Sequence, residues 1–521
     1  VKEVVRGFKE RNLPLSAIHL DIDYMDEYRV FTINHKRFPD LESLTEDLRR
    51  DDVRVVAILD VGVKIDTEYA LYKDGLEKDV FCKLPNGKPV KGRVWPGWCN
   101  FPDFSSERVR NWWAHQYPLL LDKGISGFWH DMNEPSVFVA WGEPNLPLAT
   151  RYSLEGRGGS HQGVNNLYGH LMNRAGYEGL KRFRPNRRPW IVSRSGWAGM
   201  QRFAWNWTGD IETSWAALRQ TLSMMLGMGL SGVPFTGSDI GGFSGDPDSE
   251  LFVRWFQLAA FTPFFRGHSA VGTKRREPWV YGEQITKIIK KYLQLRYKLL
   301  PYIYTAAWQA SRYGFPLMRP LFWKAERNKK LLDIEDEYFF GDKLLVAPIL
   351  NEGSRRRDVF LPEGKWVDFW TDRWFDGNQT INVDASLSTI PLFVQEGSVI
   401  AMETGQTMTI HLYVPGFDNE KEFESFLYSD SGDGYGEWRV DRFKVHCENG
   451  ELTLAHEFEG DYQLPYDLII LKLHGARGIK AKINSHNIRI ENNLIKLRKL
   501  EPVTFLIEPV DVYKYVEIQK N

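Results

Sequence analysis

The sequence predicts an α/β protein: a TIM-type (β/α)8 barrel followed by two antiparallel β-sandwich domains. Up to residue 315, short apolar strands alternate with amphipathic helices, which is the pattern of parallel βα units. Beyond that point long helices cease, and short β-rich runs alternate with turn signals, as in antiparallel sandwiches. We therefore expect a barrel over residues 1–315, a proximal β domain over 316–402 and a distal one over 403–521.

Hydrophobic periodicity and short β-branched runs define the expected elements. The expected barrel strands are 17–23, 53–60, 125–131, 190–194 and 233–239, and the segment 203–210, which ends at Asp210, belongs to the same series between the last two. The expected helices are 1–11, 41–50, 105–123, 167–183, 214–230, 251–265 and 283–312. Later strands are expected at 344–349, 358–361, 366–370, 392–400, 408–414, 426–428, 468–473 and 513–518.

Charged residues stand at or just past the C-terminal ends of the expected barrel strands. They are Asp21, Asp23, Asp60, Asp131, Arg194, Asp210 and Asp239. A barrel gathers its strand ends around one axis, where the active site lies, whereas an open sheet brings together only those near its switch point. No glycine-rich nucleotide-binding loop follows the first strand. The pattern therefore favours a barrel with a site at this end.

Composition argues against several classes of function. Lys and Arg total 67 against 68 Asp and Glu, and the net charge of −1 offers no electrostatic footprint for nucleic acid or an anionic membrane. No stretch reaches the roughly 18 apolar residues of a membrane helix, and no signal sequence opens the chain. Cys82, Cys99 and Cys447 are too few and too scattered for a disulfide framework or a zinc site. We therefore expect a reduced, cytoplasmic protein without a cofactor.

Tryptophan is concentrated in the expected barrel, where 13 of the 19 lie in residues 95–279. Most of them are expected to fill the core, but Trp is also the preferred flat, amphipathic surface for a sugar. Asp131 and Asp210 both follow aromatic residues at strand ends. Two carboxylates in an aromatic cleft are the minimum that glycoside hydrolysis requires, so the pair points to that chemistry.

A metal site is the competing interpretation of the strand end at 130–134. His130, Asp131 and Glu134 are residue types that bind metal ions. Neighbouring residues on a strand point to opposite faces, however, so His130 and Asp131 should not converge on one ion. The sequence therefore predicts no metal among the site residues.

Residues 18–268 resemble the catalytic barrel of glycoside hydrolase family 31, the α-glucosidase and α-xylosidase group. Seven short motifs carry the resemblance, in the family's order. They are DIDYMD at 21–26, VWPG at 94–97, WHDMNE at 129–134, SRS at 193–195, WTGD at 207–210, GSD at 237–239 and RGH at 266–268. Residues 341–348 and 361–366 resemble the family's proximal β domain, and 428–437 resemble a turn of its distal one.

The resemblance implies a role for the matched residues. Asp131 is implied as the nucleophile and Asp210 as the acid/base. The implied substrate-binding residues are Asp21, Trp95, Trp129, Arg194, Trp207, Asp239 and His268. The implied reaction is exo-acting removal of terminal α-linked glucose from malto-oligosaccharides by double displacement, with retention of the anomeric configuration.

Three related activities stay open at this point: an α-xylosidase, an α-transglucosylase and an α-glucan lyase of the same family. A non-catalytic carbohydrate-binding subunit is an alternative from another class, which the intact Asp131 and Asp210 disfavour. In the family, an N-terminal β-sandwich precedes the barrel and contributes a loop to the pocket. Val1 lies in what the resemblance assigns to the helix after the first barrel strand, so we expect a fragment, or pairing with a segment that supplies those parts. A homo-oligomer is also open.

Overall fold

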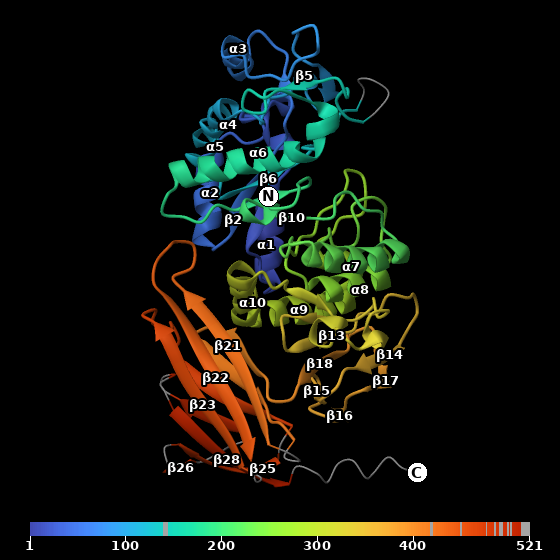
Figure 1. The fold of residues 1–521 in the computed structure, drawn as a ribbon, viewed down its shortest axis with the longest axis vertical. Coiled ribbons are helices and arrows are strands. Elements are labelled where there is room, and N and C mark those ends of the chain that lie inside the picture. Colours follow the sequence, from blue (N-terminus) through green and yellow to red (C-terminus); the bar gives the residue numbers. More distant parts are fainter. Residues whose placement is uncertain are drawn as a thin grey trace. The chain divides into compact units, whose positions relative to one another are not determined.

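The computed structural model describes residues 1–138, 144–416, 420–448, 451–475, 477–483, 486–488, 493–497, 500 and 503–511. The chain forms two compact units (Figure 1). The first comprises residues 1–209 with 433–435, and the second comprises 210–432 with 436–521. The strand expected at 513–518 lies outside the described residues.

A five-stranded parallel sheet forms the centre of the first unit. Its strands, in spatial order, are β1 (Ala17–Leu20), β2 (Arg54–Leu59), β6 (Gly127–His130), β9 (Ile191–Ser193) and β10 (Trp205–Asn206). Spatial order follows chain order, as in consecutive βα units of a barrel. The first four strands confirm the sequence prediction, with shorter bounds. All four residues of β6 are buried, because a parallel strand is covered on both faces.

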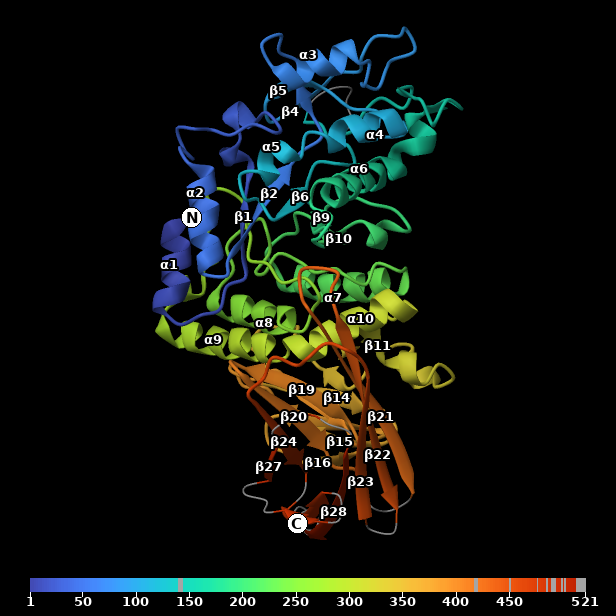
Figure 2. The ribbon, with the colours of Figure 1, turned by 90° about the vertical axis from the view of Figure 1, so that its left-hand side faces the viewer.

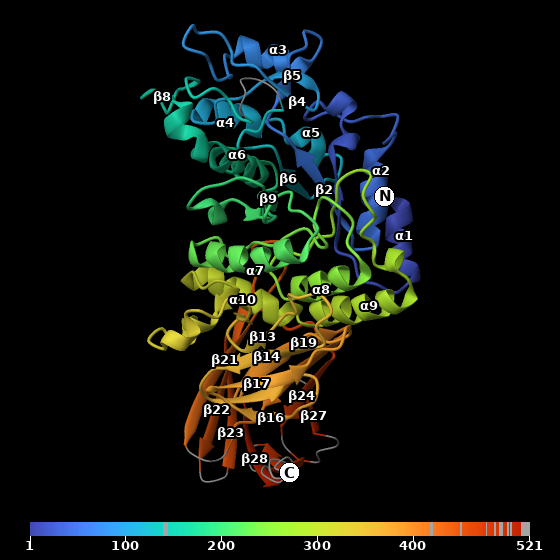
Figure 3. The ribbon, with the colours of Figure 1, turned by 90° about the vertical axis from the view of Figure 1, so that its right-hand side faces the viewer.

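Two amphipathic helices lie side by side in the first unit. They are α1 (Lys2–Glu10) and α2 (Leu41–Arg50), both close to the predicted bounds (Figures 2 and 3). Ion pairs of 3.1 Å from Lys2 to Asp47 and 2.8 Å from Lys9 to Asp51 join them at their exposed edges. The contacts between α2 and β2 bury the apolar side of α2 against the sheet.

The helix expected over 105–123 is two helices, α4 (Glu107–Ala114) and α5 (Pro118–Leu121). The prediction of one continuous helix is wrong because Pro118 has no N–H to donate to the carbonyl of Ala114. α4 packs against the long helix α6 (His161–Phe183), which begins earlier than predicted.

Short elements complete the first unit. A three-stranded antiparallel sheet of order β3–β5–β4 follows β2, with β5 in its centre. The bounds are β3 (Val63–Lys64), β4 (Gly92–Val94), β5 (Gly97–Asn100), β7 (Arg151–Tyr152), β8 (Gly159–Ser160) and α3 (Ala70–Glu77). Three single turns of 3-10 helix are Ile22–Tyr24, Asp26–Tyr28 and Met200–Arg202.

Four helices form the helical part of the second unit. They are α7 (Trp215–Leu230), α8 (Ser249–Ala259), α9 (Glu283–Lys298) and α10 (Leu300–Tyr313), with 3-10 turns at Pro278–Tyr281, Leu321–Lys324 and Lys329–Leu331. α8 and α9 pack side by side (Figure 3). The single helix predicted over 283–312 is interrupted at Leu299, because Pro301 cannot donate to the carbonyl of Tyr297.

The strand predicted at 233–239 is wrong: this segment is buried but irregular. Pro234 lacks the N–H that a central strand would use. Gly237 lies so close to the next segment that a Cβ there would sit 2.1 Å from the carbonyl oxygen of Phe264. One isolated parallel bridge, between Asp239 and Arg266, is the strand-like contact at its end.

Beyond the helices, the described residues of the second unit form three larger sheets and one strand pair. The sheet orders are β11–β12–β13–β18–β15–β16, β14–β17, β19–β20–β24–β27 and β21–β22–β23–β28–β25–β26. The bounds are β11 (Met318–Pro320), β12 (Tyr338–Phe340), β13 (Leu344–Val346), β14 (Arg356–Leu361), β15 (Lys365–Asp368), β16 (Trp374–Asp376), β17 (Gln379–Asp384), β18 (Leu392–Gln395), β19 (Val399–Thr404), β20 (Thr407–Tyr413), β21 (Lys421–Asp430), β22 (Trp438–Glu448), β23 (Glu451–Gly460), β24 (Leu468–His474), β25 (Arg477–Ile483), β26 (His486–Ile488), β27 (Leu494–Leu497) and β28 (Val503–Asp511).

Pairing in these sheets is antiparallel, as predicted, with one exception among the described strands. β20 pairs in parallel with β24, so the prediction of purely antiparallel sandwiches is wrong at this position. The reason is topological: between them the chain forms β21, β22 and β23 in another sheet, which is a crossover long enough for a parallel pair. One run predicted as a single strand, 392–400, is two strands, β18 and β19.

Among the residues that the structure describes, buried side chains of the β region form two separate hydrophobic clusters. One is drawn from positions 321–393 and includes Trp366 and Phe393. The other is drawn from positions 399–500 and includes Leu412 and Phe443. Within the part of the chain that the structure describes, no helix combines the length and apolar character needed to cross a membrane.

Candidate active site

Asp131 follows β6 directly, at the carboxyl end of the parallel sheet. The backbone N–H of Met132 donates a 2.8 Å hydrogen bond to Asp131 Oδ1. Met132 has φ +54°, a left-handed conformation that is uncommon for a side chain of this size. The chain therefore turns sharply after the strand, and the turn aims an N–H at the carboxylate.

Arg194 follows β9, the neighbouring strand, and holds two carboxylates. Its Nη1 lies 3.0 Å from Asp131 Oδ1. Its Nε and Nη2 donate to the two oxygens of Glu134 at 2.9 and 2.8 Å. A guanidinium that is fixed in this way keeps its charge and its N–H donors in one place beside both carboxylates.

Asn133 ties the ends of these strands together. Its side chain donates to Ser193 Oγ at 2.9 Å and accepts from the N–H of Ser195 at 3.1 Å. Asn206, at the end of β10, donates to the carbonyl of Ser193 at 3.0 Å. Asn133 was not predicted as a site residue, although it stands in the matched WHDMNE segment. It positions the loop that carries Arg194.

Asp60 and Asp21 end the two strands on the other side of β6. Asp60 is buried, and burial raises its pKa well above the usual range, with further contributions from the charges of Asp131 and Asp21 that outweigh the opposing charge of Arg194. Asp21 begins a 3-10 turn, where its Oδ1 accepts from the N–H of Ile22 at 2.7 Å. The sequence placed Asp60 at a strand end, but its burial comes from the tertiary structure.

His130 points into the interior. One ring nitrogen lies 2.8 Å from Asn173 Oδ1 and the other 2.8 Å from the hydroxyl of Tyr117. Burial lowers its pKa to about 4, so the imidazole is neutral at pH 7. A metal site that uses His130 together with Asp131 is therefore contradicted by the geometry. Across the described residues, no group of three or more His, Cys, Asp or Glu side chains is arranged to bind a metal.

The predicted tryptophans differ in exposure. Trp129 and Trp207 are buried and pack edge to face, with ring centroids 5.8 Å apart. Trp95 is 45% exposed and meets the ring of Phe138 edge to face at 4.7 Å. Trp95 is therefore the one of the three that presents a large aromatic surface to solvent.

In the second unit, Asp239 and Arg266 form a buried ion pair. Arg266 Nε and Nη2 both donate to Asp239 Oδ1, at 3.0 and 2.8 Å. His268 lies two residues further on, and burial, followed by the charges of Arg266 and Arg276, lowers its pKa to about 3. Its imidazole is therefore neutral. Arg266 stands in the RGH motif but was not predicted as a site residue.

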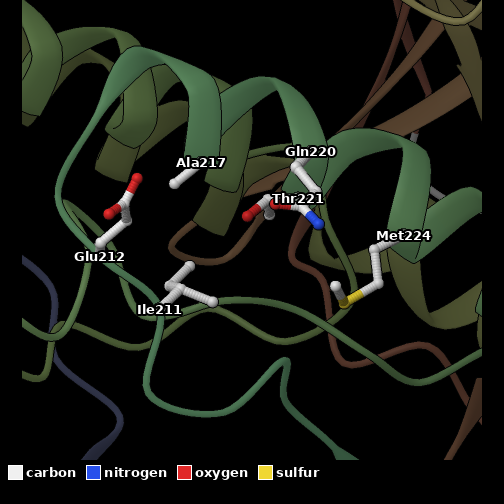
Figure 4. Close-up of a pocket in the computed structure, with 6 residues that line it drawn as sticks. All are labelled: Ile211, Glu212, Ala217, Gln220, Thr221 and Met224. Atoms are coloured by element: carbon white, nitrogen blue, oxygen red, sulfur yellow. The ribbon is translucent and has the colours of Figure 1, made fainter.

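Asp210 is the first residue of the second unit and is exposed. The residues after it line a cavity of about 190 Å³ beside α7. Figure 4 shows its six lining side chains: Ile211, Glu212, Ala217, Gln220, Thr221 and Met224. No predicted site residue lines this cavity. The other predicted residues divide between the units, with Asp21, Trp95, Trp129, Asp131, Arg194 and Trp207 in the first and Asp239 and His268 in the second.

Two family models match the chain. The glycosyl hydrolases family 31 TIM-barrel domain matches residues 1–306, and the glycosyl hydrolase family 31 C-terminal domain matches residues 314–400. The first match alone covers more than half of the chain.

Individual relatives agree with these models. Alpha-glucosidase 2 of Bacillus thermoamyloliquefaciens is 39% identical over 93% of this chain and 63% of its own length. The catalytic subunit in the crystal structure of the ER glucosidase II heterodimeric complex superposes with a TM-score of 0.87 at 29% identity, over 98% of this chain and 60% of that one. The crystal structure of the α-xylosidase of Xanthomonas citri superposes with a TM-score of 0.80 at 26% identity, over 96% of this chain and 57% of that one. The chain thus spans less than two thirds of the length of each.

Proposed function

The chain belongs to glycoside hydrolase family 31, and we propose that it is a retaining, exo-acting α-glucosidase that removes terminal glucose from malto-oligosaccharides. One observation carries the proposal: the Asp131 carboxylate is held at a strand end by both Arg194 and the N–H of Met132. An oriented, ionised carboxylate at the carboxyl end of a parallel strand is suited to nucleophilic attack. The name of the 39% identical relative supports glucose as the sugar.

In the first step, Asp131 attacks the anomeric carbon of the terminal glucose. The bond from that carbon to the leaving oxygen breaks, and Asp210 gives its proton to this oxygen. The product is a β-linked glucosyl ester on Asp131 and a free, shortened oligosaccharide.

In the second step, Asp210 accepts a proton from water as the water oxygen attacks the anomeric carbon. The ester bond breaks, Asp131 is restored as a carboxylate, and glucose leaves in the α configuration. Asp210 is exposed in this structure, so water is removed from its carboxyl group only when substrate covers it.

The remaining residues bind the glucose unit. We assign Asp21, Asp239 and His268 to its hydroxyl groups, with Arg266 holding the orientation of Asp239. The neutral imidazole of His268 can donate or accept one hydrogen bond without adding charge. Trp95 provides the exposed aromatic wall, while the buried pair Trp129 and Trp207 supports the site from within.

We also propose that the barrel occupies residues 1–315 and that β domains occupy 316–402 and 403–521. The two separate hydrophobic clusters, from positions 321–393 and 399–500, support this division. Cys82, Cys99 and Cys447 are buried and form no disulfide, which supports a reducing compartment such as the cytoplasm.

Chemical rescue tests the proposed nucleophile. The variant Asp131→Ala should lose turnover, and added azide should restore it with β-glucosyl azide as product, because azide attacks from the face that the carboxylate occupied. Glucose released by the unmodified protein should be the α anomer when observed by proton NMR before mutarotation. Rescue of Asp131→Ala that yields α-glucosyl azide would contradict the assignment of Asp131 as the nucleophile. Release of β-glucose as the first product of the unmodified protein would contradict the retaining mechanism.

An α-xylosidase is the second candidate, because 96% of this chain superposes on the α-xylosidase of Xanthomonas citri. Initial rates on α-glucosyl fluoride and α-xylosyl fluoride compare the two sugars with the same leaving group. The proposal expects a higher kcat/KM for the glucosyl compound, and the opposite preference would make the protein a xylosidase.

A further inference from the structure

Large aromatic side chains are exposed on and beside the small sheet β3–β5–β4. Of these, only Trp95 has a role in the proposed function. Trp98, on β5, is 51% exposed, and Trp95 and Phe138 are 45% and 49% exposed. Single exposed apolar residues are ordinary. Here three large exposed aromatic side chains lie on one hairpin and the segment hydrogen-bonded to it, and exposed aromatic surface concentrated in this way is typical of binding surfaces. We call Trp98, Phe138 and Arg93 the hairpin platform, and Trp95 stands between it and the proposed glucose pocket.

Trp98 is exposed on a rigid strand. β5 is the central strand of its sheet, paired to β3 on one side and to β4 on the other. The next side chain, Cys99, is fully buried, so the strand presents Trp98 on the opposite, open face. Because the backbone of Trp98 is fixed, only its side-chain torsions must be ordered when a ligand stacks on the ring.

The turn that joins Trp95 to Trp98 is also fixed. Lys64 Nζ donates a 2.6 Å hydrogen bond to the carbonyl of Pro96. Gly97 has φ +103°, a conformation that favours glycine, and it lets the chain reverse within two residues. The N–H of Phe138 donates to the carbonyl of Arg93 at 2.8 Å, which places the Phe138 ring against Trp95.

Arg93 adds hydrogen-bond donors beside the aromatic face. It lies directly opposite Trp98 in the β4–β5 register, and both side chains are exposed. Residues opposite each other in an antiparallel pair share a face, with Cβ atoms about 4.5–5.5 Å apart. A flat apolar ring with adjacent N–H donors fits a pyranose, whose C–H face is apolar and whose rim carries hydroxyl groups.

Chain connectivity links this platform to the proposed active site. β3 begins three residues after Asp60, the buried carboxylate at the end of β2, and pairs directly with β5. Trp95, which we assign to the glucose pocket, stands on the same hairpin as Trp98. A substrate whose terminal glucose meets Trp95 would continue past it toward solvent.

We propose that the hairpin platform binds the leaving-group side of the substrate: Trp98 stacks on a glucose unit beyond the cleaved bond, and Arg93 donates to its hydroxyl groups. This inference rests on the proposed function, because it extends the same site. Trp98 would then determine the preference for substrate chain length, so that kcat/KM is higher for malto-oligosaccharides than for substrates with a small leaving group.

The test compares two substrates. α-Glucosyl fluoride fills only the glucose pocket, whereas maltotetraose also covers the platform. In Trp98→Ala the ratio of kcat/KM for maltotetraose to that for α-glucosyl fluoride should fall about five- to tenfold, mainly through KM, as expected for loss of one aromatic stacking contact. Trp98→Phe keeps a ring and should retain most of the ratio.

Trp438→Ala is the matched control, since Trp438 is 42% exposed but lies on β22 in a different sheet. Its ratio should equal that of the unmodified protein. Equal ratios of kcat/KM in Trp98→Ala and Trp438→Ala would overturn the proposed platform. It would also be overturned if kcat/KM of the unmodified protein did not rise with added glucose units. Thermal unfolding of each variant checks that it is folded, and Trp98→Phe provides the comparison if Trp98→Ala does not fold.

A binding measurement separates failure of the platform from failure of the proposed function. Isothermal titration of maltotetraose into Asp131→Ala, with and without Trp98→Ala, needs no turnover. A five- to tenfold weaker Kd in the double variant supports the platform even if the protein hydrolyses neither substrate, in which case the α-glucosidase proposal alone fails. Equal Kd values overturn the platform whatever the activity.

Discussion

Arg194 holds Asp131 and Glu134 at the same time: Nη1 lies 3.0 Å from Asp131 Oδ1, while Nε and Nη2 each donate to one oxygen of Glu134. One guanidinium therefore balances two carboxylates at the end of the parallel sheet. The fork of Arg194 is used on both sides, which a lysine could not reproduce. Glu134 thus positions the cation that in turn orients the proposed nucleophile.

Arg194→Lys should lower kcat/KM on maltose by about 100-fold, because a shorter, single-point cation leaves the Asp131 carboxylate misplaced by a fraction of an ångström or more. Steady-state kinetics with α-glucosyl fluoride and maltose measures the loss. Glu134→Gln keeps two atoms of the same size at the fork and should cost less than Arg194→Lys. A loss in Arg194→Lys of less than about threefold would contradict the role assigned to the fork.

Asp60→Asn should stabilise the first unit at neutral pH. Burial raises the folded-state pKa of Asp60 above its unfolded value, so its contribution to stability is present below the unfolded pKa and is lost as pH rises through the folded pKa. Asn keeps the shape without the charge. The Tm of Asp60→Asn minus the Tm of the unmodified protein should therefore grow between pH 4 and pH 8. Each kcal/mol of difference in unfolding free energy should correspond to about 2–4 °C in Tm.

A Tm difference for Asp60→Asn that is the same at pH 4 and pH 8 would show that Asp60 does not change its ionisation on folding. Asp23→Asn is the matched control, because Asp23 is an exposed carboxylate that pairs with Arg37 on the surface. Its Tm difference should stay small across the same pH range.

His268 should contribute to acid sensitivity. Its folded-state pKa of about 3 lies below the unfolded value near 6.5, so the unfolded chain binds more protons between these values and stability falls as pH drops through this window. In His268→Gln this titration is absent. The unfolding free energy of the unmodified protein minus that of His268→Gln should therefore be larger at pH 7 than at pH 4, measured by urea unfolding at both values.

The opposite trend for His268→Gln, with a larger difference at pH 4, would mean that His268 is charged in the folded protein. The same variant should raise KM for maltose, because we assign His268 to a hydroxyl group of the glucose unit. A change confined to kcat would move His268 from binding to another role.

Chelation should leave the activity unchanged. In the proposed mechanism Asp210 transfers the proton and Arg194 balances the charge of Asp131, so no step requires a metal ion. Initial rates on maltose before and after dialysis against EDTA provide the measurement. A loss that added Ca²⁺ or Zn²⁺ restores would contradict this mechanism.

Much of the first unit could be predicted from local patterns. The strands that end at Asp21, Asp60, Asp131 and Arg194 are short apolar runs, and the motifs around them identify the family. The helix breaks missed within 105–123 and 283–312 could also have been predicted from the local sequence, because Pro118 and Pro301 each remove a helical hydrogen bond. The error at 233–239 had a local signal too, because Pro234 lacks the N–H of a central strand. The close approach of Gly237 to Phe264 could not be predicted from the sequence, since it depends on tertiary packing.

The sequence by itself determined which residues can carry the chemistry: the carboxylates and the arginine at the strand ends, in the family's order. Only the tertiary structure decided how they are paired and hydrated. The burial of Asp60, the ion pair of Asp239 with Arg266 and the exposure of Trp98 depend on which segments pack against each side chain. Solvation and charge pairing are set by neighbours in space, and segments far apart in the chain supply those neighbours.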